Sequence, residues 1–222
     1  MATYLLVHGA WGGGYGYREI ALRLRAEGHE VHIASLTGLG DRVHLVSPAI
    51  DLTTHVNDVL AVIDGERLSN LILVGHSYGG MIITAVSALR AAKIRNLVYV
   101  DAFLPRDGEA LWDVATEWER KHYIDSQRDV PGLMAPFPGS PPILTRHPLL
   151  TVLQPYRASG EESQIQRRTY IYATRDAPTV FTQFHERVSN DPAWKSYTLH
   201  TGHIVMMDDP DGLTTILLAE AE

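Results

Sequence analysis

The chain has 222 residues, of which 45% are hydrophobic and 20% are charged, and this composition can supply a full core for one compact domain. It excludes disorder, a collagen-like repeat and a disulfide-stapled miniprotein. The 26 acidic and 19 basic side chains give a net charge of -7, which argues against nucleic acid as the main partner because phosphate binding depends on clustered positive charge. The chain has no cysteine, so disulfides, thiolate metal sites and a cysteine nucleophile are all excluded.

No targeting or membrane segment is recognisable in the sequence. The apolar residues 4–7 lack a preceding basic region, and no apolar run approaches the roughly 18 residues that a membrane span needs. The expected location is therefore cytoplasmic.

Short apolar runs alternate with segments of helical period, which predicts a mostly parallel sheet of about six strands flanked by helices. The predicted strands are 3–7, 29–34, 70–74, 96–100, 170–173 and 196–199, and the predicted helices are 17–26, 52–63, 78–91, 179–188 and 211–221. Asp51 is placed to cap the second helix. Residues 102–168 hold 8 of the 12 prolines and show no steady period. We therefore predict a single α/β domain over residues 1–222, with 102–168 inserted in it as a cap.

A G-x-S-x-G motif follows the most continuous apolar strand, at Gly75-His76-Ser77-Tyr78-Gly79. A sharp turn from a strand into a helix lifts such a serine above the edge of the sheet, and the helix N-terminus directs its N–H groups at the space where an oxyanion would form. Ser77 is therefore the predicted nucleophile. The alternative is an ordinary glycine-rich turn in which the serine caps the helix.

A glycine-rich loop, His8-Gly9-Ala10-Trp11-Gly12-Gly13-Gly14, directly follows the first strand. A dinucleotide fingerprint would need a third glycine where Tyr17 stands, so that interpretation is weak. A loop beside the nucleophile can instead supply a backbone N–H to an oxyanion hole. We assign the two donors to the N–H groups of Ala10 and Tyr78, and give His8 a structural role.

A serine nucleophile needs a histidine base and an acid that orients the base. Of the eleven histidines, His203 lies just after the last strand and before the last helix, at the sheet edge where Ser77 emerges. Asp176, in the loop after the fifth strand, is the preferred acid. Asp101, at the end of the fourth strand, is its rival. His200 and His203 form an H-x-x-H pair, but no further ligand cluster supports a metal site.

With these residues assigned, the chain resembles small α/β-hydrolases. The resemblance rests on Leu6 to Trp11, Leu36 to Arg42, Gly75 to Gly80, Tyr99 to Phe103, and Gly202-His203. It is greatest to bacterial esterases of the branch with pyrethroid- and carbamate-cleaving enzymes, and more distant to plant methylesterases and hydroxynitrile lyases. The resemblance implies an α/β-hydrolase fold trimmed at its N-terminal edge, a Ser77–His203–Asp176 triad, and Ala10 and Tyr78 as oxyanion donors.

The sequence departs from these families at two positions. The lyases carry a lysine after the catalytic histidine, and Ile204 stands there in this chain, which weighs against lyase chemistry. Many bacterial relatives have a second histidine where this chain has Gly12, so an altered pocket mouth is expected.

The sequence therefore predicts a serine esterase that cleaves small, largely apolar or aromatic carboxylic esters through an acyl-enzyme. The alternatives are a carbamate or amide hydrolase with the same triad, or a non-hydrolytic protein similar to the hydroxynitrile lyases. Trp11 is expected to contact the substrate, and neither a cofactor nor a metal is expected. The expected partner is a small ester, not nucleic acid or a membrane, and a homodimer is the assembly considered.

Overall fold

The computed structural model describes residues 1–222 and contains a six-stranded sheet in the order β2-β1-β3-β4-β7-β8. All five neighbouring pairs of strands are parallel. The strands of this sheet are β1 (Thr3–Val7), β2 (Glu30–Ile33), β3 (Leu71–Ser77), β4 (Ile94–Ala102), β7 (Arg167–Ala173) and β8 (Lys195–Leu199). The predicted parallel sheet of six strands is confirmed.

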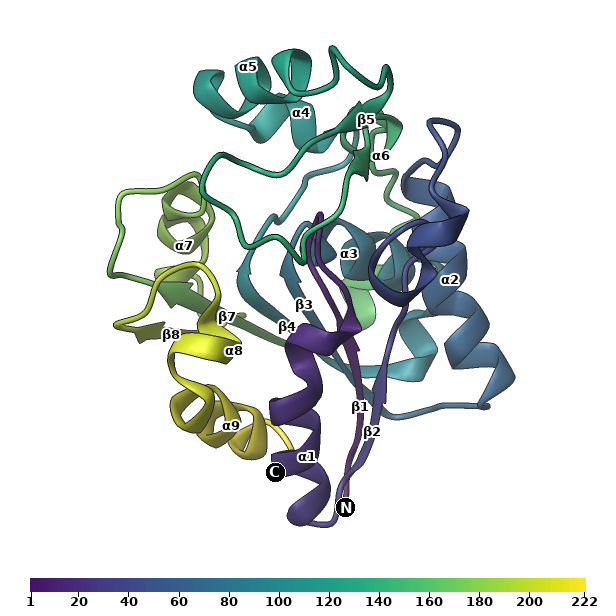
Figure 1. The fold of residues 1–222 in the computed structure, drawn as a ribbon. Helices are drawn as coiled ribbons and strands as arrows, with labels where there is room; N and C mark the ends of the chain where they lie inside the picture. Colours follow the sequence, from purple (N-terminus) through teal and green to yellow (C-terminus); the bar gives the residue numbers. More distant parts are fainter.

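Helices cover both faces of the sheet (Figure 1). On one face α1 (Arg18–Ala26) packs against α9 (Pro210–Ala219), and on the other α2 (Leu52–Gly65) packs against α3 (Gly79–Arg90). The remaining helices are α4 (Leu111–Val114), α5 (Glu117–Asp125), α6 (Leu150–Leu153), α7 (Thr182–Ser189), α8 (Val205–Asp208) and the 3₁₀ turns η1 (Gly14–Tyr17), η2 (Gly40–Leu45), η3 (Ala91–Lys93) and η4 (Glu161–Gln164). None of the helices is long and apolar enough to cross a membrane.

Alternation along the strands divides the core into two clusters, one on each face of the sheet. Leu5, Leu73 and Tyr99 join the cluster beneath α2, α3 and α7, whereas Leu6 and Val74 join the cluster beneath α1 and α9. Because both faces are covered, β3 is buried at every residue, as the continuous apolar run in the sequence predicts.

Asp51 caps α2 as predicted. Its Oδ1 accepts hydrogen bonds from the Thr54 N–H and the Thr54 hydroxyl, both at 2.8 Å, and the Asp51 N–H donates to Thr54 Oγ1 at 3.4 Å. This reciprocal arrangement satisfies helix N–H groups that lack an intrahelical acceptor. It fixes the start of the helix that carries His55.

Segment 102–168 connects β4 to β7 and holds α4, α5, α6, η4 and a small antiparallel pair, β5 (Leu133–Met134) and β6 (His147–Pro148). In Figure 1, α4, α5, β5 and α6 lie beyond the ends of the sheet strands, on the side opposite the two chain termini. Two strands run further than predicted at their C-terminal ends: β3 continues to Ser77 and β4 to Ala102. These extensions bring Ser77 and Asp101 to the same edge of the sheet.

Candidate active site

Ser77 stands at a strained turn between β3 and α3. Its φ is +55°, in the left-handed region that residues other than glycine rarely adopt. A Cβ on Gly79 would lie 2.7 Å from the Val7 carbonyl oxygen, so a glycine is needed there for the turn to approach β1. The twelve-residue helix α3 starts two residues after Ser77, and its positive end therefore lies beside the serine. This is the geometry that the G-x-S-x-G motif predicts.

His203 is paired with Asp101. The His203 Nδ1–H donates to Asp101 Oδ2 at 2.7 Å, and the other carboxylate oxygen accepts the Ala173 N–H at 3.2 Å. Asp101 is only 1% exposed and has a φ of +41°, whereas the His203 side chain is 38% exposed. Because Nδ1 carries the proton, Nε2 is left with a lone pair that can accept a proton.

The structure corrects the preference for Asp176 as the partner of His203. The Asp176 side chain is 63% exposed and its nearest cation is Arg175, at 3.8 Å. The loop after β7 instead stays hydrogen-bonded to the segment after β8, because the Arg175 N–H donates to the Thr201 carbonyl at 3.0 Å. Asp176 is thereby held at the outer surface, and the rival, Asp101, makes the contact.

The glycine loop after β1 packs directly against Ser77. A Cβ on Gly9 would lie 2.9 Å from Ser77 Cβ, so a side chain there would push the loop away. The next N–H, that of Ala10, donates to no protein acceptor, and neither does the N–H of Tyr78. Two unpaired N–H groups therefore lie near Ser77. One belongs to Tyr78, the next residue in the chain, and the other to Ala10, which follows the glycine that packs against Ser77.

Aromatic side chains surround this edge of the sheet. The Phe181 ring stacks on the His203 ring with centroids 4.7 Å apart, and Phe103 in turn packs against Phe181 at 5.0 Å. The indole of Trp11 packs against Phe137 of segment 102–168 at 5.0 Å. Trp118 stacks on Phe137 with centroids 4.9 Å apart and is 64% exposed.

A second histidine, His76, touches the base. The His76 Nε2–H donates to the backbone carbonyl of His203 at 2.8 Å, and the two rings lie 4.6 Å apart. Burial lowers the pKa of His76 well below its usual range, which keeps it neutral beside His203. This contact leaves no local pattern in the sequence, because it joins residues 127 positions apart.

Four buried histidines predict a loss of stability in acid. Burial lowers the pKa of His8 to about 4, and it also lowers the pKa values of His55, His76 and His147. In the unfolded chain these groups take up protons below about pH 6.5, but the folded chain resists protonation. Stability is therefore lost as the pH falls from about 6.5 toward 4, with about 3 kcal/mol from His8 alone at the lower limit.

Urea unfolding at pH 7.5 and pH 5.0 measures this effect. We expect a lower free energy of unfolding at pH 5.0, and a smaller difference between the two pH values in a His8→Asn variant. His44→Asn, at an exposed position, is the control and should leave the difference unchanged. Equal stability at the two pH values would contradict the prediction.

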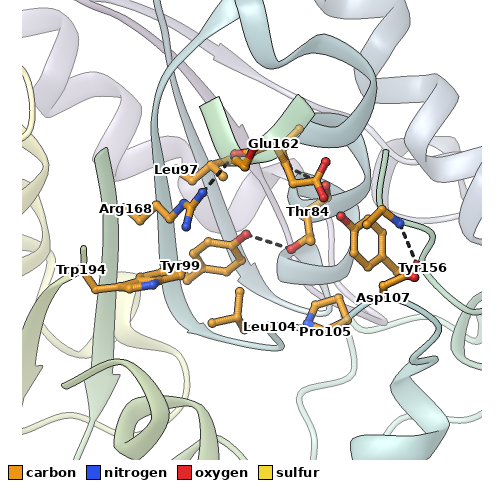
Figure 2. Close-up of a pocket in the computed structure, with 13 residues that line it drawn as sticks. Thr84, Leu97, Tyr99, Leu104, Pro105, Asp107, Tyr156, Glu162, Arg168 and Trp194 are labelled. Carbon is orange, nitrogen blue, oxygen red and sulfur yellow. Dashed lines mark hydrogen bonds between the residues drawn. The ribbon is translucent and has the colours of Figure 1, made fainter. Parts of the chain in front are cut away.

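A pocket of about 250 Å³ lies elsewhere, between α3, β4 and β7 (Figure 2). Figure 2 shows the hydroxyls of Thr84 and Tyr99 joined by a hydrogen bond, which is 2.8 Å long. The Arg168 guanidinium lies over the Trp194 ring, 5.9 Å from its centroid. Neither Ser77 nor His203 lines this pocket. No group of three or more His, Asp or Glu side chains is arranged to hold a metal ion.

Comparison with known proteins agrees with the fold. The sequence profile described as "Alpha/beta hydrolase family" matches residues 4–215. The chain belongs to the α/β-hydrolase family. It is 37% identical over 240 residues to a carbendazim hydrolyzing esterase of a Nocardioides species, covering 99% of both chains. It is also 36% identical over 109 residues to a pyrethroid hydrolase of Sphingobium wenxiniae, covering 47% of this chain and 37% of the other.

Solved α/β-hydrolases share the architecture at lower sequence identity. An extracellular α/β-hydrolase from a Paenibacillus species is 21% identical and superposes with a TM-score of 0.84, covering 100% of this chain and 99% of that one. The predicted α/β-hydrolase fold and the resemblance to bacterial esterases are thus confirmed. The carbendazim hydrolyzing esterase and the pyrethroid hydrolase support ester hydrolysis as the general reaction class of this family member.

Proposed function

We propose that the protein is a serine esterase that cleaves carboxylic esters through an acyl-enzyme. The observation that carries the proposal is the hydrogen bond from His203 Nδ1 to the buried Asp101, at the sheet edge where Ser77 is held at a strained turn. An imidazole oriented by a buried carboxylate, at the sheet edge that holds a strained serine, is the arrangement that activates a serine hydroxyl.

In the proposed reaction Ser77 Oγ attacks the ester carbonyl carbon while His203 Nε2 takes the hydroxyl proton. The N–H groups of Ala10 and Tyr78 stabilise the oxyanion, and His203 then returns the proton to the leaving alcohol. Water repeats the sequence on the acyl-enzyme and releases the acid. Asp101 stays ionised and holds His203 in the Nδ1–H tautomer.

The aromatic surroundings of His203 and the Trp11–Phe137 contact support small, largely apolar or aromatic substrates. The full-length relative that hydrolyses carbendazim is an esterase, and this supports the same reaction class here. Residues 102–168 are proposed to act as a cap that shapes the substrate pocket. Hydrolysis of carbamates by the same residues is a second candidate, because it differs only in the group attached to the carbonyl.

A rapid-mixing experiment with p-nitrophenyl acetate tests the proposal. We expect a burst of p-nitrophenol close to one equivalent per chain when deacylation is slower than acylation, and an acetyl adduct on the peptide that contains Ser77. A panel of short, long and aromatic acyl esters with matched carbamates and amides then ranks the substrate classes. Turnover without an adduct on that peptide would contradict the covalent mechanism, and no turnover of any ester would contradict the proposed function.

A further inference from the structure

Trp11 occupies an unfavourable backbone conformation next to the first oxyanion donor. Its φ is +60°, and the Gly12 N–H donates to the Ala10 carbonyl at 2.7 Å, which closes a three-residue turn with Trp11 at its centre. A turn of this kind with positive φ is rare and strained for a residue with a side chain. It persists only where surrounding structure holds it. Ala10 supplies the carbonyl that closes this turn, so the placement of Ala10, and with it the position of the Ala10 N–H, is tied to the turn.

Segment 102–168 bonds all three polar groups of Trp11. The Trp11 N–H donates to His147 Nδ1 at 3.4 Å, and the Trp11 carbonyl accepts the Thr145 N–H at 2.9 Å. The indole Nε1–H donates to the Met134 carbonyl at 3.2 Å. Each of these contacts joins residues more than 120 positions apart in the chain. The strained turn is therefore held from outside the glycine loop.

The hydrogen bonds of His147 determine its protonation state. Since Nδ1 faces the Trp11 N–H, that nitrogen must accept, and the ring proton lies on Nε2. The Nε2–H donates to Thr151 Oγ1 at 2.7 Å, and the Thr151 hydroxyl donates to the Pro148 carbonyl at 2.7 Å. His147 is fully buried, so a ring N–H that faced no protein acceptor could not form a hydrogen bond with water instead. In this series of hydrogen bonds, from Trp11 through His147 and Thr151 to Pro148, every donor meets an acceptor only when His147 is the neutral Nε2–H tautomer.

We propose that segment 102–168 positions the first oxyanion donor, with His147 as the positioning residue that holds the Trp11 turn and thereby aims the Ala10 N–H. This inference rests on the proposed function, and it gives Trp11 a structural task in addition to the predicted contact with substrate. His147 touches no reacting atom in this proposal. It acts through Trp11 on Ala10.

A pair of amide substitutions isolates the hydrogen bond. In His147→Asn the side-chain oxygen can take the place of Nδ1 and accept the Trp11 N–H, whereas in His147→Gln the amide reaches the position of Nε2 and leaves that N–H without an acceptor. We expect kcat for p-nitrophenyl acetate to fall roughly 10-fold in His147→Gln with KM changed less than about 2-fold, since a displaced donor weakens mainly transition-state binding. His147→Asn should retain most of the wild-type kcat.

His122→Gln is the matched control. His122 also belongs to segment 102–168 and packs against the Trp11 ring at 6.4 Å, but it bonds to the Ala135 carbonyl and to no backbone atom of Trp11. We expect its kcat to stay near the wild-type value. Should His147→Gln fail to fold, Thr151→Val removes the acceptor of His147 Nε2–H with little change of shape and is expected to lower kcat less strongly.

Amide hydrogen exchange of residues 9–13 gives a readout that does not depend on ester turnover. Exchange in this loop should be faster in His147→Gln than in the wild type, His147→Asn and His122→Gln. Unchanged kcat and exchange in His147→Gln would overturn the inference, and so would an equal loss in His147→Asn. If no variant, including the wild type, hydrolyses an ester, the proposed function fails while the exchange data still decide whether His147 holds the loop.

Discussion

Replacing Ser77 with alanine is expected to lower ester turnover by roughly 10⁴- to 10⁶-fold, because it removes the hydroxyl that is proposed to form the acyl-enzyme. The fold should be unaffected. Alanine keeps the Cβ that packs against Gly9. The measurements are kcat/KM for p-nitrophenyl acetate, covalent labelling by a fluorophosphonate, and the midpoint of thermal unfolding.

Ser87→Ala is the control for this substitution. Ser87 is a buried serine of α3 whose hydroxyl donates to the Thr84 carbonyl at 2.7 Å, and it lies outside the candidate site. We expect Ser87→Ala to keep its turnover and its labelling while losing some stability. Labelling of Ser77→Ala at the wild-type rate, or residual turnover within about 10-fold of the wild type, would show that another residue is the nucleophile.

The sheet and the nucleophile turn could be predicted from the sequence because local patterns encode them. Strand β1 has the predicted bounds, and β3 and β4 were placed correctly at their cores. The ends of β3 and β4 were not predictable, since pairing between the two strands continues through Ser77 and Ala102, where the motif and the polar Asp101 interrupt the apolar pattern. Element ends depend on partners that lie far away in the sequence.

The partner of His203 could not be predicted for the same reason. Asp101 and Asp176 both follow apolar strands, and no local pattern tells which carboxylate ends up buried. One signal was present: Asp101 has the apolar neighbours Val100 and Ala102, whereas Asp176 lies between Arg175 and Ala177 in a turn-forming segment. In a strand that is covered on both faces, a carboxylate between apolar neighbours is buried as well. A buried carboxylate needs a partner such as a histidine N–H.

The prolines of segment 102–168 set it apart in the sequence, but its contacts with the rest of the chain could not be predicted. Its bonds to Trp11 could not be read from the sequence, because they come from two backbone groups, one histidine and one threonine hydroxyl of an aperiodic stretch. The structure also explains why the glycine loop tolerates a strained tryptophan. The three non-glycine residues with positive φ at this edge of the sheet are Trp11, Ser77 and Asp101. Strain of this kind concentrates at functional sites.

The acid assignment leads to a prediction with a matched control in the same chain. We expect Asp101→Asn to lower kcat/KM by roughly 10³- to 10⁴-fold and Asp176→Asn to change it less than about 2-fold. Asparagine tolerates the positive φ of residue 101, and its side-chain oxygen can still accept the Ala173 N–H. Its amide nitrogen then faces His203 Nδ1 with a donor, so the imidazole must place its proton on Nε2. In that tautomer His203 cannot take the proton of Ser77.

The pH profile distinguishes this tautomer effect from a loss of structure. Asp101→Asn should recover part of its activity at high pH, where hydroxide can remove the serine proton without the base, while its thermal midpoint stays near that of the wild type. Asp176→Asn should keep the wild-type profile, because its carboxylate faces solvent beside Arg175. A large loss in Asp176→Asn together with full activity in Asp101→Asn would mean that the loop after β7 rearranges in solution and that the buried Asp101–His203 pair is not the catalytic one.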